Sequence, residues 1–139
     1  NLLNSILAKI QANAAGADDA IMLDSRGFIA ETNATHLFMV QGGLLRTPTV
    51  AACPEGITRA TVLGLCRTHA IAHEIGDLSL AELYRADEAF CTGTMGELAG
   101  VTEVDGRRIG DGTIGPMTRR LSALYAECTA AGGTRMVEP

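Results

Sequence analysis

The sequence predicts a single α/β domain built on a mixed, curled (pseudo-barrel) sheet with flanking helices. Short apolar runs of strand length alternate with segments whose apolar residues recur at helical spacing. Several of these runs are separated by turns that contain Gly and Asp, which is typical of hairpins rather than of a doubly wound parallel sheet. The 139 residues suit one domain, and 47% hydrophobic against 19% charged residues favours a well-buried core.

The composition argues against several classes of partner. The formal net charge is −5 with acidic and basic residues interspersed, so no basic stripe is available for nucleic acid. No apolar run has membrane-spanning length. The cysteines are scattered and are expected to be reduced thiols of a cytoplasmic protein. His69 and His73 are four residues apart, but the helix is expected to end between them, so a structural role is favoured and no metal site is predicted.

The first half of the chain is expected to form a helix and four strands. Apolar residues recur at helical spacing in the opening segment, which predicts a buried stripe, and Gly16 is placed to end the helix. The stripe consists of Leu3, Ile6, Leu7, Ile10 and Ala14. The strands are expected at 20–23, 28–32, 37–40 and 44–47, with turns at 24–27 and 42–43.

The second half is expected to alternate between helices and strands. After a loop over 48–55, a helix is expected from Thr58 to about Ala70, and Ser79 with Glu82 has the spacing of a capping box for a short helix to Tyr84. Pro116 is placed to open the last helix, before a frayed tail after Ala131. Strands are expected at 71–75, 89–92 and 98–104, the last turning at Asp105-Gly106. The inner faces of the two long helices are expected to be Val62, Leu65, Cys66 and Ala70, and Met117, Leu121, Leu124 and Cys128.

The most informative stretch is Gly56-Ile57-Thr58-Arg59, where a loop turns into a helix. The first amides of a helix have no partner and carry partial positive charge from the helix dipole. Gly56 lets an anion approach the backbone, and Thr58 adds a hydroxyl. We call residues 56–58 the anion cup, because this arrangement suits a phosphate. An ordinary capped helix is the alternative interpretation.

Two further segments could contribute to the same site. Glu31 ends an otherwise apolar strand, so its carboxylate is expected to be desolvated and to need a cation or a protonated ring nitrogen, unless it points to water. The run Cys91-Thr92-Gly93-Thr94-Met95 offers hydroxyls and amides at a strand end for a phosphate or carboxylate, although a plain turn is equally compatible.

Taken together, these segments resemble the class IV (fold-type-IV) pyridoxal-phosphate aminotransferases, most closely the branched-chain amino acid enzymes. The resemblance extends over nearly the whole chain and includes 1–9, 16–24, 27–31, 45–48, 54–59, 86–90 and 110–118, in matching order and spacing. It implies the large, C-terminal cofactor-binding domain over 1–139, pyridoxal 5′-phosphate as cofactor, and transamination between an amino acid, expected to be aliphatic, and a 2-oxo acid. It also implies a homodimer.

The resemblance assigns roles to individual residues. Glu31 corresponds to the carboxylate that keeps the cofactor's pyridine nitrogen protonated, so that the ring accepts electrons from the substrate. Gly56, Ile57, Thr58, Gly93 and Thr94 correspond to the segments that hold the phosphate, and Thr94 with Met95 to the turn that meets the substrate's carboxylate. Arg59 could neutralise this region or form a structural salt bridge.

Other features of the family are expected outside this chain. The family's reaction needs a lysine that binds the cofactor covalently. The single lysine, Lys9, lies off the apolar stripe and is expected on the solvated face of its helix. The resemblance places the catalytic lysine just before Asn1, together with an absent N-terminal small domain, so the isolated chain is expected to be inactive.

Several alternatives remain open from the sequence. Leu2 stands where branched-chain enzymes usually carry a tyrosine, and resembles the D-amino acid aminotransferases more; His36 replaces a common asparagine. An aminodeoxychorismate lyase type of reaction on the same cofactor site, or a binding domain without activity, is also compatible.

Overall fold

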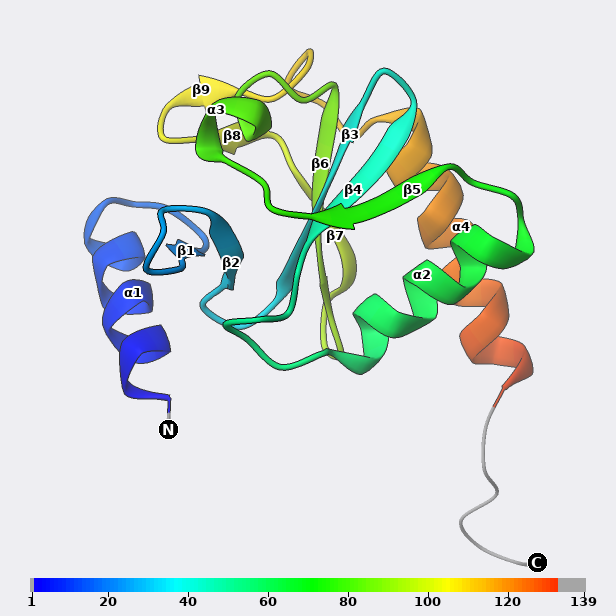
Figure 1. Ribbon diagram of the computed structural model, residues 1–139, viewed down its shortest axis with the longest axis horizontal. Coiled ribbons are helices and arrows are strands. Elements are labelled where there is room, and N and C mark those ends of the chain that lie inside the picture. The colour runs from blue at the N-terminus through cyan, green and yellow to red at the C-terminus, as the bar shows by residue number, and fades with distance from the viewer. Residues whose placement is uncertain (1, 133–139) are drawn as a thin grey trace, which may run out of the picture.

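The computed structural model describes residues 2–132 and confirms a mixed α/β architecture. Its centre is a five-stranded sheet in the order β5-β4-β3-β6-β7, in which only the β4–β5 pair is parallel. Two short hairpins, β1–β2 and β8–β9, lie beside it (Figure 1). The strands are β1 (Ile21–Leu23), β2 (Ile29–Thr32), β3 (His36–Gln41), β4 (Leu44–Pro48), β5 (His73–Gly76), β6 (Glu88–Gly93), β7 (Glu97–Val101), β8 (Glu103–Val104) and β9 (Arg107–Arg108).

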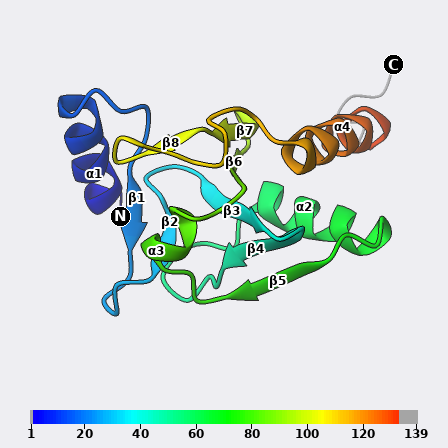
Figure 2. The same cartoon turned by 90° about the horizontal axis from the view of Figure 1, so that it is seen from above.

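The helices are α1 (Leu3–Ala14), α2 (Ile57–Thr68), α3 (Leu80–Leu83) and α4 (Pro116–Ala131). Figure 2 shows α1 at the end of the molecule opposite to α2 and α4. None of the described helices is long and apolar enough to cross a membrane. Of the expected frayed tail, all but Gly132 falls outside the described residues.

Alternation along the central strands buries both faces of the sheet. On β3, Leu37 and Met39 belong to a cluster with Leu78, Leu83 and Ile109, beneath α3 and the β8–β9 hairpin. Phe38 and Val40 point the other way, into a cluster with residues of α2 and α4. In that second cluster the Phe38 and Phe90 rings stack at a centroid distance of 5.0 Å. The sheet thus lies between α3 with the β8–β9 hairpin on one face and α2 with α4 on the other.

Most local signals in the sequence predict the observed boundaries. Gly16 follows α1 in the left-handed region, Ser79 and Glu82 form the reciprocal capping box of α3, and Pro116 opens α4. Asp105 and Gly106 both have positive φ and turn the β8–β9 hairpin. The expected strand over 98–104 was wrong as one unit, because the chain leaves the central sheet at Thr102 and pairs instead with 107–108.

The predicted inner faces of the three long helices differ in part from the observed ones. Cys128 is exposed at the end of α4, and Ala70 lies exposed beyond α2 with φ +50°, whereas Leu63 packs inside. The apolar stripe of α1 is not buried within this chain: its four largest side chains are each more than half exposed. These are Leu3, Ile6, Leu7 and Ile10.

The opposite face of α1 turns inward. Ala12 is buried on that face, and the Lys9 ammonium donates a hydrogen bond to the Asp18 carbonyl. Lys9 is thus half-buried on the face that also holds Ala12, whereas a position on the solvated face was expected. The helix contacts β1, and the segment after the helix folds back on this face through the hydrogen bond from the Ala17 amide to the Ala12 carbonyl.

Candidate active site

Three segments that are distant in sequence meet at one edge of the central sheet. They are the N-terminal end of β3, the start of α2 and the turn between β6 and β7, near the lower edge of the sheet in Figure 1. Together they enclose a pocket of about 120 Å³. Its lining consists of Ala34, His36, Gly56, Ile57, Thr58, Thr92, Gly93 and Thr94.

Antiparallel pairing between β3 and β6 brings the two strand ends together. In this register His36 lies directly opposite Thr92, so the β3 entry and the β6 exit share one end of the sheet. Gly93 permits close packing there, because a Cβ at this position would lie 2.9 Å from the Thr35 methyl carbon. The sheet register thus positions the third predicted segment beside the anion cup.

The anion cup has the backbone geometry that its sequence predicts. Gly56 is the N-cap of α2 with φ +72° and no side-chain cap. The amides of Ile57 and Thr58 donate no hydrogen bond within residues 2–132. Thr58 is buried, whereas the Ile57 side chain is 86% exposed and contributes through its backbone. A helix start with free amides that face a pocket can hold a phosphate group.

The side of the pocket formed by β6 contains an unpaired polar atom. The Thr92 hydroxyl is buried and has no hydrogen-bond partner in the described structure. An unsatisfied buried hydroxyl costs free energy, and a ligand oxygen is one way to remove that cost. Thr92 belongs to the third predicted segment, but it was not predicted as a site residue.

His36 connects the anion cup to Glu31. Its ring lies against Gly56, where any Cβ would collide with it, and its Nε2 donates to the Pro54 carbonyl at 2.7 Å. Glu31 does not line the pocket itself. One of its carboxylate oxygens nevertheless lies within 4.8 Å of a ring nitrogen of His36. The Cys53 sulfur lies within 4.8 Å of both of these atoms.

The Glu31 carboxylate is half-buried on β2, as the sequence predicts for an acid at the end of an apolar strand. Burial raises its pKa, and the nearby His36 opposes this shift. No hydrogen bond to this carboxylate is found among the described residues. Such a carboxylate fits a cationic ring nitrogen, which would return the free energy lost on desolvation.

Arg59 does not serve as a structural salt bridge. Its guanidinium is buried, and Nη2 donates to the Pro48 carbonyl at 2.8 Å, with a longer contact from Nε to the Thr47 hydroxyl. Within residues 2–132 it has no carboxylate partner. Of the two roles considered for Arg59, the salt bridge is not observed, and hydrogen bonds to Pro48 and Thr47 take its place.

Met95 and Thr94 lie in the exposed β6–β7 turn, with the Met95 side chain fully exposed. Thr94 lines the pocket and Met95 does not. The position of Met95 beyond the pocket mouth is compatible with contact to the outer part of a bound molecule. Its assignment to the substrate remains a prediction.

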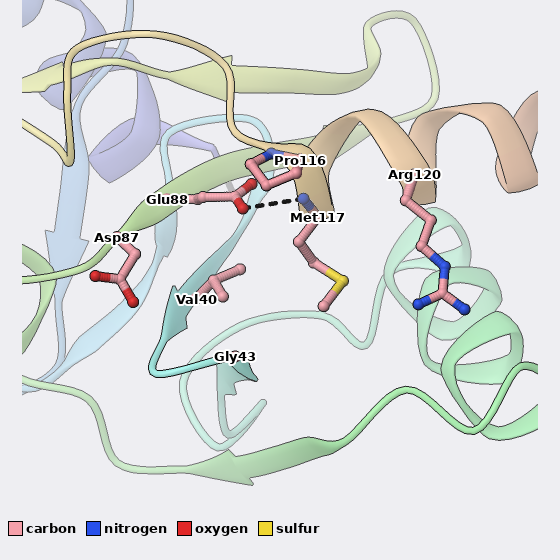
Figure 3. A pocket seen from close by; sticks show the side chains of 7 residues that line it. All are labelled: Val40, Gly43, Asp87, Glu88, Pro116, Met117 and Arg120. Carbon is pink, nitrogen blue, oxygen red and sulfur yellow. Dashed lines mark hydrogen bonds between the residues drawn. The ribbon is translucent and has the colours of Figure 1, made fainter.

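A larger hollow of about 390 Å³ lies elsewhere, between β3, β6 and the start of α4 (Figure 3). Both acidic groups in its lining are already engaged. Asp87 accepts a hydrogen bond from the Gly42 amide at 2.7 Å. Glu88 accepts hydrogen bonds from the Met117 and Thr118 amides at 2.9 Å and from the Thr118 hydroxyl at 2.8 Å. Figure 3 shows Arg120 directed away from this carboxylate. Glu88 therefore caps α4, and the smaller pocket is the better candidate for chemistry despite its size.

Comparison with known proteins agrees with this geometry. Residues 1–104 match the family model described as amino-transferase class IV. The chain is 52% identical over 133 residues to branched-chain-amino-acid aminotransferase-like protein 2 of Arabidopsis thaliana, covering 96% of this chain and 24% of that protein. It is 40% identical over 139 residues to a putative branched-chain-amino-acid aminotransferase of Methanocaldococcus jannaschii, covering 99% of this chain and 48% of that protein.

The solved structures that superpose on this chain are also branched-chain amino acid aminotransferases. The branched-chain amino acid aminotransferase of Thermobaculum terrenum, in its PLP-form (holo-form), superposes with a TM-score of 0.89 at 35% identity, covering 94% of this chain and 43% of that one. The Escherichia coli branched-chain amino acid aminotransferase gives a TM-score of 0.89 at 36% identity, covering 91% of this chain and 43% of that one. The chain spans less than half the length of these proteins.

Proposed function

Because the chain belongs to the class IV aminotransferase family, we propose that it is the cofactor-binding part of a pyridoxal-phosphate transaminase. The parent protein would transfer an amino group between an amino acid, branched-chain or otherwise aliphatic, and a 2-oxo acid. The observation that carries this proposal is the convergence of the anion cup, the unpaired Thr92 hydroxyl and the Glu31–His36 pair around one pocket. The branched-chain names of the relatives support the substrate class.

The residues present fit this cofactor. When bound, pyridoxal phosphate supplies a protonated ring that accepts electrons from the substrate's α-carbon. The Ile57 and Thr58 amides and the Thr58 and Thr92 hydroxyls would hold the phosphate, with Thr94 at the pocket mouth. Glu31 would hold the proton on the ring nitrogen. Thr94 and Met95 would meet the substrate's carboxylate.

We also propose the remaining features that the family resemblance implies. The parent protein would carry an N-terminal small domain and, just before the position of Asn1, the cofactor-binding lysine. It would act as a cytoplasmic homodimer with each site near the subunit interface. The hydrogen bond from Lys9 to the Asp18 carbonyl supports the view that Lys9 does not take the catalytic role. Mass measurement of the native polypeptide and light scattering of the purified protein test the length and the oligomeric state.

The cofactor site can be tested by direct binding to the 139-residue chain. Pyridoxal phosphate binding, followed by its absorbance and by calorimetry, should weaken about tenfold in Thr58→Val, since one hydrogen bond from hydroxyl to charged phosphate is worth about 1.5 kcal/mol. Thr68→Val, on an exposed position at the other end of α2, is the matched control. Equal binding by both variants would remove the Thr58 hydroxyl from the site.

The reaction type needs the parent protein. Amino-group transfer to a 2-oxo acid, assayed beside pyruvate release from aminodeoxychorismate, separates the transaminase from the lyase. L- and D-leucine as paired substrates separate the branched-chain enzyme from a D-amino acid aminotransferase. Pyruvate release without amino transfer would overturn the proposed reaction while leaving the cofactor site intact.

A further inference from the structure

Three potential metal ligands of different chemistry gather beside the pocket. The Glu31 carboxylate, one ring nitrogen of His36 and the Cys53 sulfur have ligand atoms within 4.8 Å of one another. They come from three separate parts of the chain: β2, the start of β3 and the loop before α2. No other group of three such side chains lies this close together among residues 2–132. We call these three residues the Glu31 cluster.

The donor set of the Glu31 cluster selects a particular class of ion. One thiolate, one imidazole and one carboxylate match the ligands of Zn²⁺, whereas Mg²⁺ and Ca²⁺ require oxygen donors. Three protein ligands with a water in the fourth position form an open zinc site. Tetrahedral bonds of about 2.0–2.3 Å place donor atoms about 3.5 Å apart. Since the three atoms lie within 4.8 Å of one another, they need to approach by about 1.3 Å at most. Cys53 lies in a loop without helix or strand, which can absorb this shift.

The surroundings of His36 prepare it as a ligand. Nε2 donates a hydrogen bond to the Pro54 carbonyl, so the neutral ring carries its proton there and keeps a free lone pair on Nδ1. Metal-binding histidines commonly make such a bond from the second nitrogen to a backbone carbonyl, which fixes the ring. Because Pro54 follows Cys53 directly, the same bond holds the thiol beside the ring.

The electrostatic balance also favours a cation. Two of the three groups are anionic when they act as ligands, and the Glu31 carboxylate accepts no hydrogen bond from the described residues. The nearest guanidinium, that of Arg59, is engaged with the Pro48 carbonyl and the Thr47 hydroxyl. Arg59 acts on Cys53 through its positive charge but donates no hydrogen bond to the cluster, so a divalent ion supplies the coordination that Arg59 does not.

We propose that the cofactor-free chain binds one Zn²⁺ ion through Glu31, His36 and Cys53, releasing the thiol proton to solvent. Zinc and the cofactor would compete, because an ion bound to Glu31 and a pyridinium ring bound to Glu31 exclude one another. This competition rests on the proposed function, whereas the zinc site itself does not. The Glu31 cluster is thus a metal-sensitive point of the cofactor site, at which zinc competes with cofactor loading.

The test uses the 139-residue chain, stripped of metal with a chelator and free of pyridoxal phosphate. Calorimetry with Zn²⁺ should give one equivalent, and Co²⁺ should give a thiolate-to-cobalt charge-transfer band with the visible spectrum of a tetrahedral site. Cys53→Ser and His36→Asn should each weaken Zn²⁺ binding by at least about tenfold, which even an outer-shell partner can cost a metal site. Circular dichroism establishes that each variant is folded.

Two exposed residues provide matched controls. Cys128→Ser and His69→Asn change the same residue types away from the cluster and should bind Zn²⁺ like the parent chain. Unchanged affinity in folded Cys53→Ser or His36→Asn, or Co²⁺ binding without the thiolate band, would overturn the site. Because no cofactor is present, this result leaves the proposed function untouched, and failure of pyridoxal phosphate binding leaves the zinc result untouched.

Competition is measured afterwards on the same sample. Pyridoxal phosphate added to the cobalt-loaded chain should bleach the charge-transfer band as the ring takes Glu31. A band that persists while the chain binds stoichiometric pyridoxal phosphate would overturn the exclusion.

Discussion

Thr47 and Thr92 are buried to the same extent, but only the Thr47 hydroxyl has a hydrogen-bond partner among the residues that the structure describes. Each is 1% exposed on a strand of the central sheet. The Thr47 hydroxyl donates a hydrogen bond to the Leu37 carbonyl at 2.8 Å and accepts a longer one from Arg59 Nε at 3.4 Å. The Thr92 hydroxyl faces the candidate site without a partner in the part of the chain that the structure describes. A buried hydroxyl without a partner needs an explanation, and its place in the pocket lining makes a bound ligand the explanation that fits Thr92.

This contrast predicts opposite effects of the same substitution. Thr92→Val removes an unpaired hydroxyl at nearly constant shape and should stabilise the cofactor-free chain by about 1 kcal/mol. Thr47→Val removes a satisfied hydroxyl and should destabilise it by about 1–3 kcal/mol. Urea unfolding of the two variants beside the parent chain measures both changes. A loss of stability in Thr92→Val equal to that in Thr47→Val would show that Thr92 is paired in solution.

At the scale of the element, α3 depends on a charged cap. Glu82 accepts hydrogen bonds from the Ser79 amide and hydroxyl and from Arg46 at 2.8–2.9 Å. The bond from the Arg46 side chain, followed by those from Ser79, lowers the pKa of Glu82 from 4.5 to about 2. The short helix thereby ties β4, the 77–79 loop and the cluster under the β8–β9 hairpin together.

The lowered pKa fixes the direction of a pH effect on stability. A carboxyl group with a depressed pKa in the folded state contributes stability that is complete above its unfolded pKa and is lost as pH falls through the folded one. The contribution of Glu82 should therefore disappear between about pH 4.5 and pH 2. Since the side chain is 29% exposed, we expect about 1 kcal/mol after solvent screening.

The variant Glu82→Gln isolates this contribution. It keeps the shape of the cap but cannot titrate, so the difference in unfolding free energy between the two proteins should shrink as pH falls through this window. Other acidic groups with lowered pKa values, Asp24 and Asp111, are present in both proteins and cancel in the difference. A difference that stays constant from neutral to acid pH would contradict the assignment.

At the scale of the whole molecule, the sequence predicts what neighbouring residues determine. Turn dipeptides, the capping box and the free start of α2 depend on residues within a few positions of one another, and these were confirmed. The end of β7 at Val101 depends on a competing pairing with Arg107 and Arg108, which no local pattern reveals.

The site was predicted in parts for the same reason. The anion cup and the desolvation of Glu31 follow from their own segments. The placement of His36 opposite Thr92 follows from the β3–β6 register, and the approach of Cys53 to Glu31 from the path of a loop, so neither could be read from spacing. The available signal for Thr92 was its place near the end of β6, two residues before the predicted site residue Thr94.

The exposed stripe of α1 gives the most direct test of the architecture. Leu7 is 52% exposed, whereas Leu121 of α4 is fully buried in the cluster with Phe38 and Phe90. Truncation of an exposed leucine leaves no cavity, so Leu7→Ala should change the unfolding free energy of the 139-residue chain by less than about 0.5 kcal/mol. Leu121→Ala should cost about 2–5 kcal/mol through lost burial and the cavity that remains.

Denaturant titration at several protein concentrations measures both variants. If Leu7→Ala is costly only at high concentration, a second copy of the chain covers the stripe in solution, because association with the folded state makes stability depend on concentration. If it is as costly as Leu121→Ala at every concentration, α1 folds back onto its own chain with the stripe inside. The face that holds Ala12 would then be the outer one, in contradiction to the observed packing.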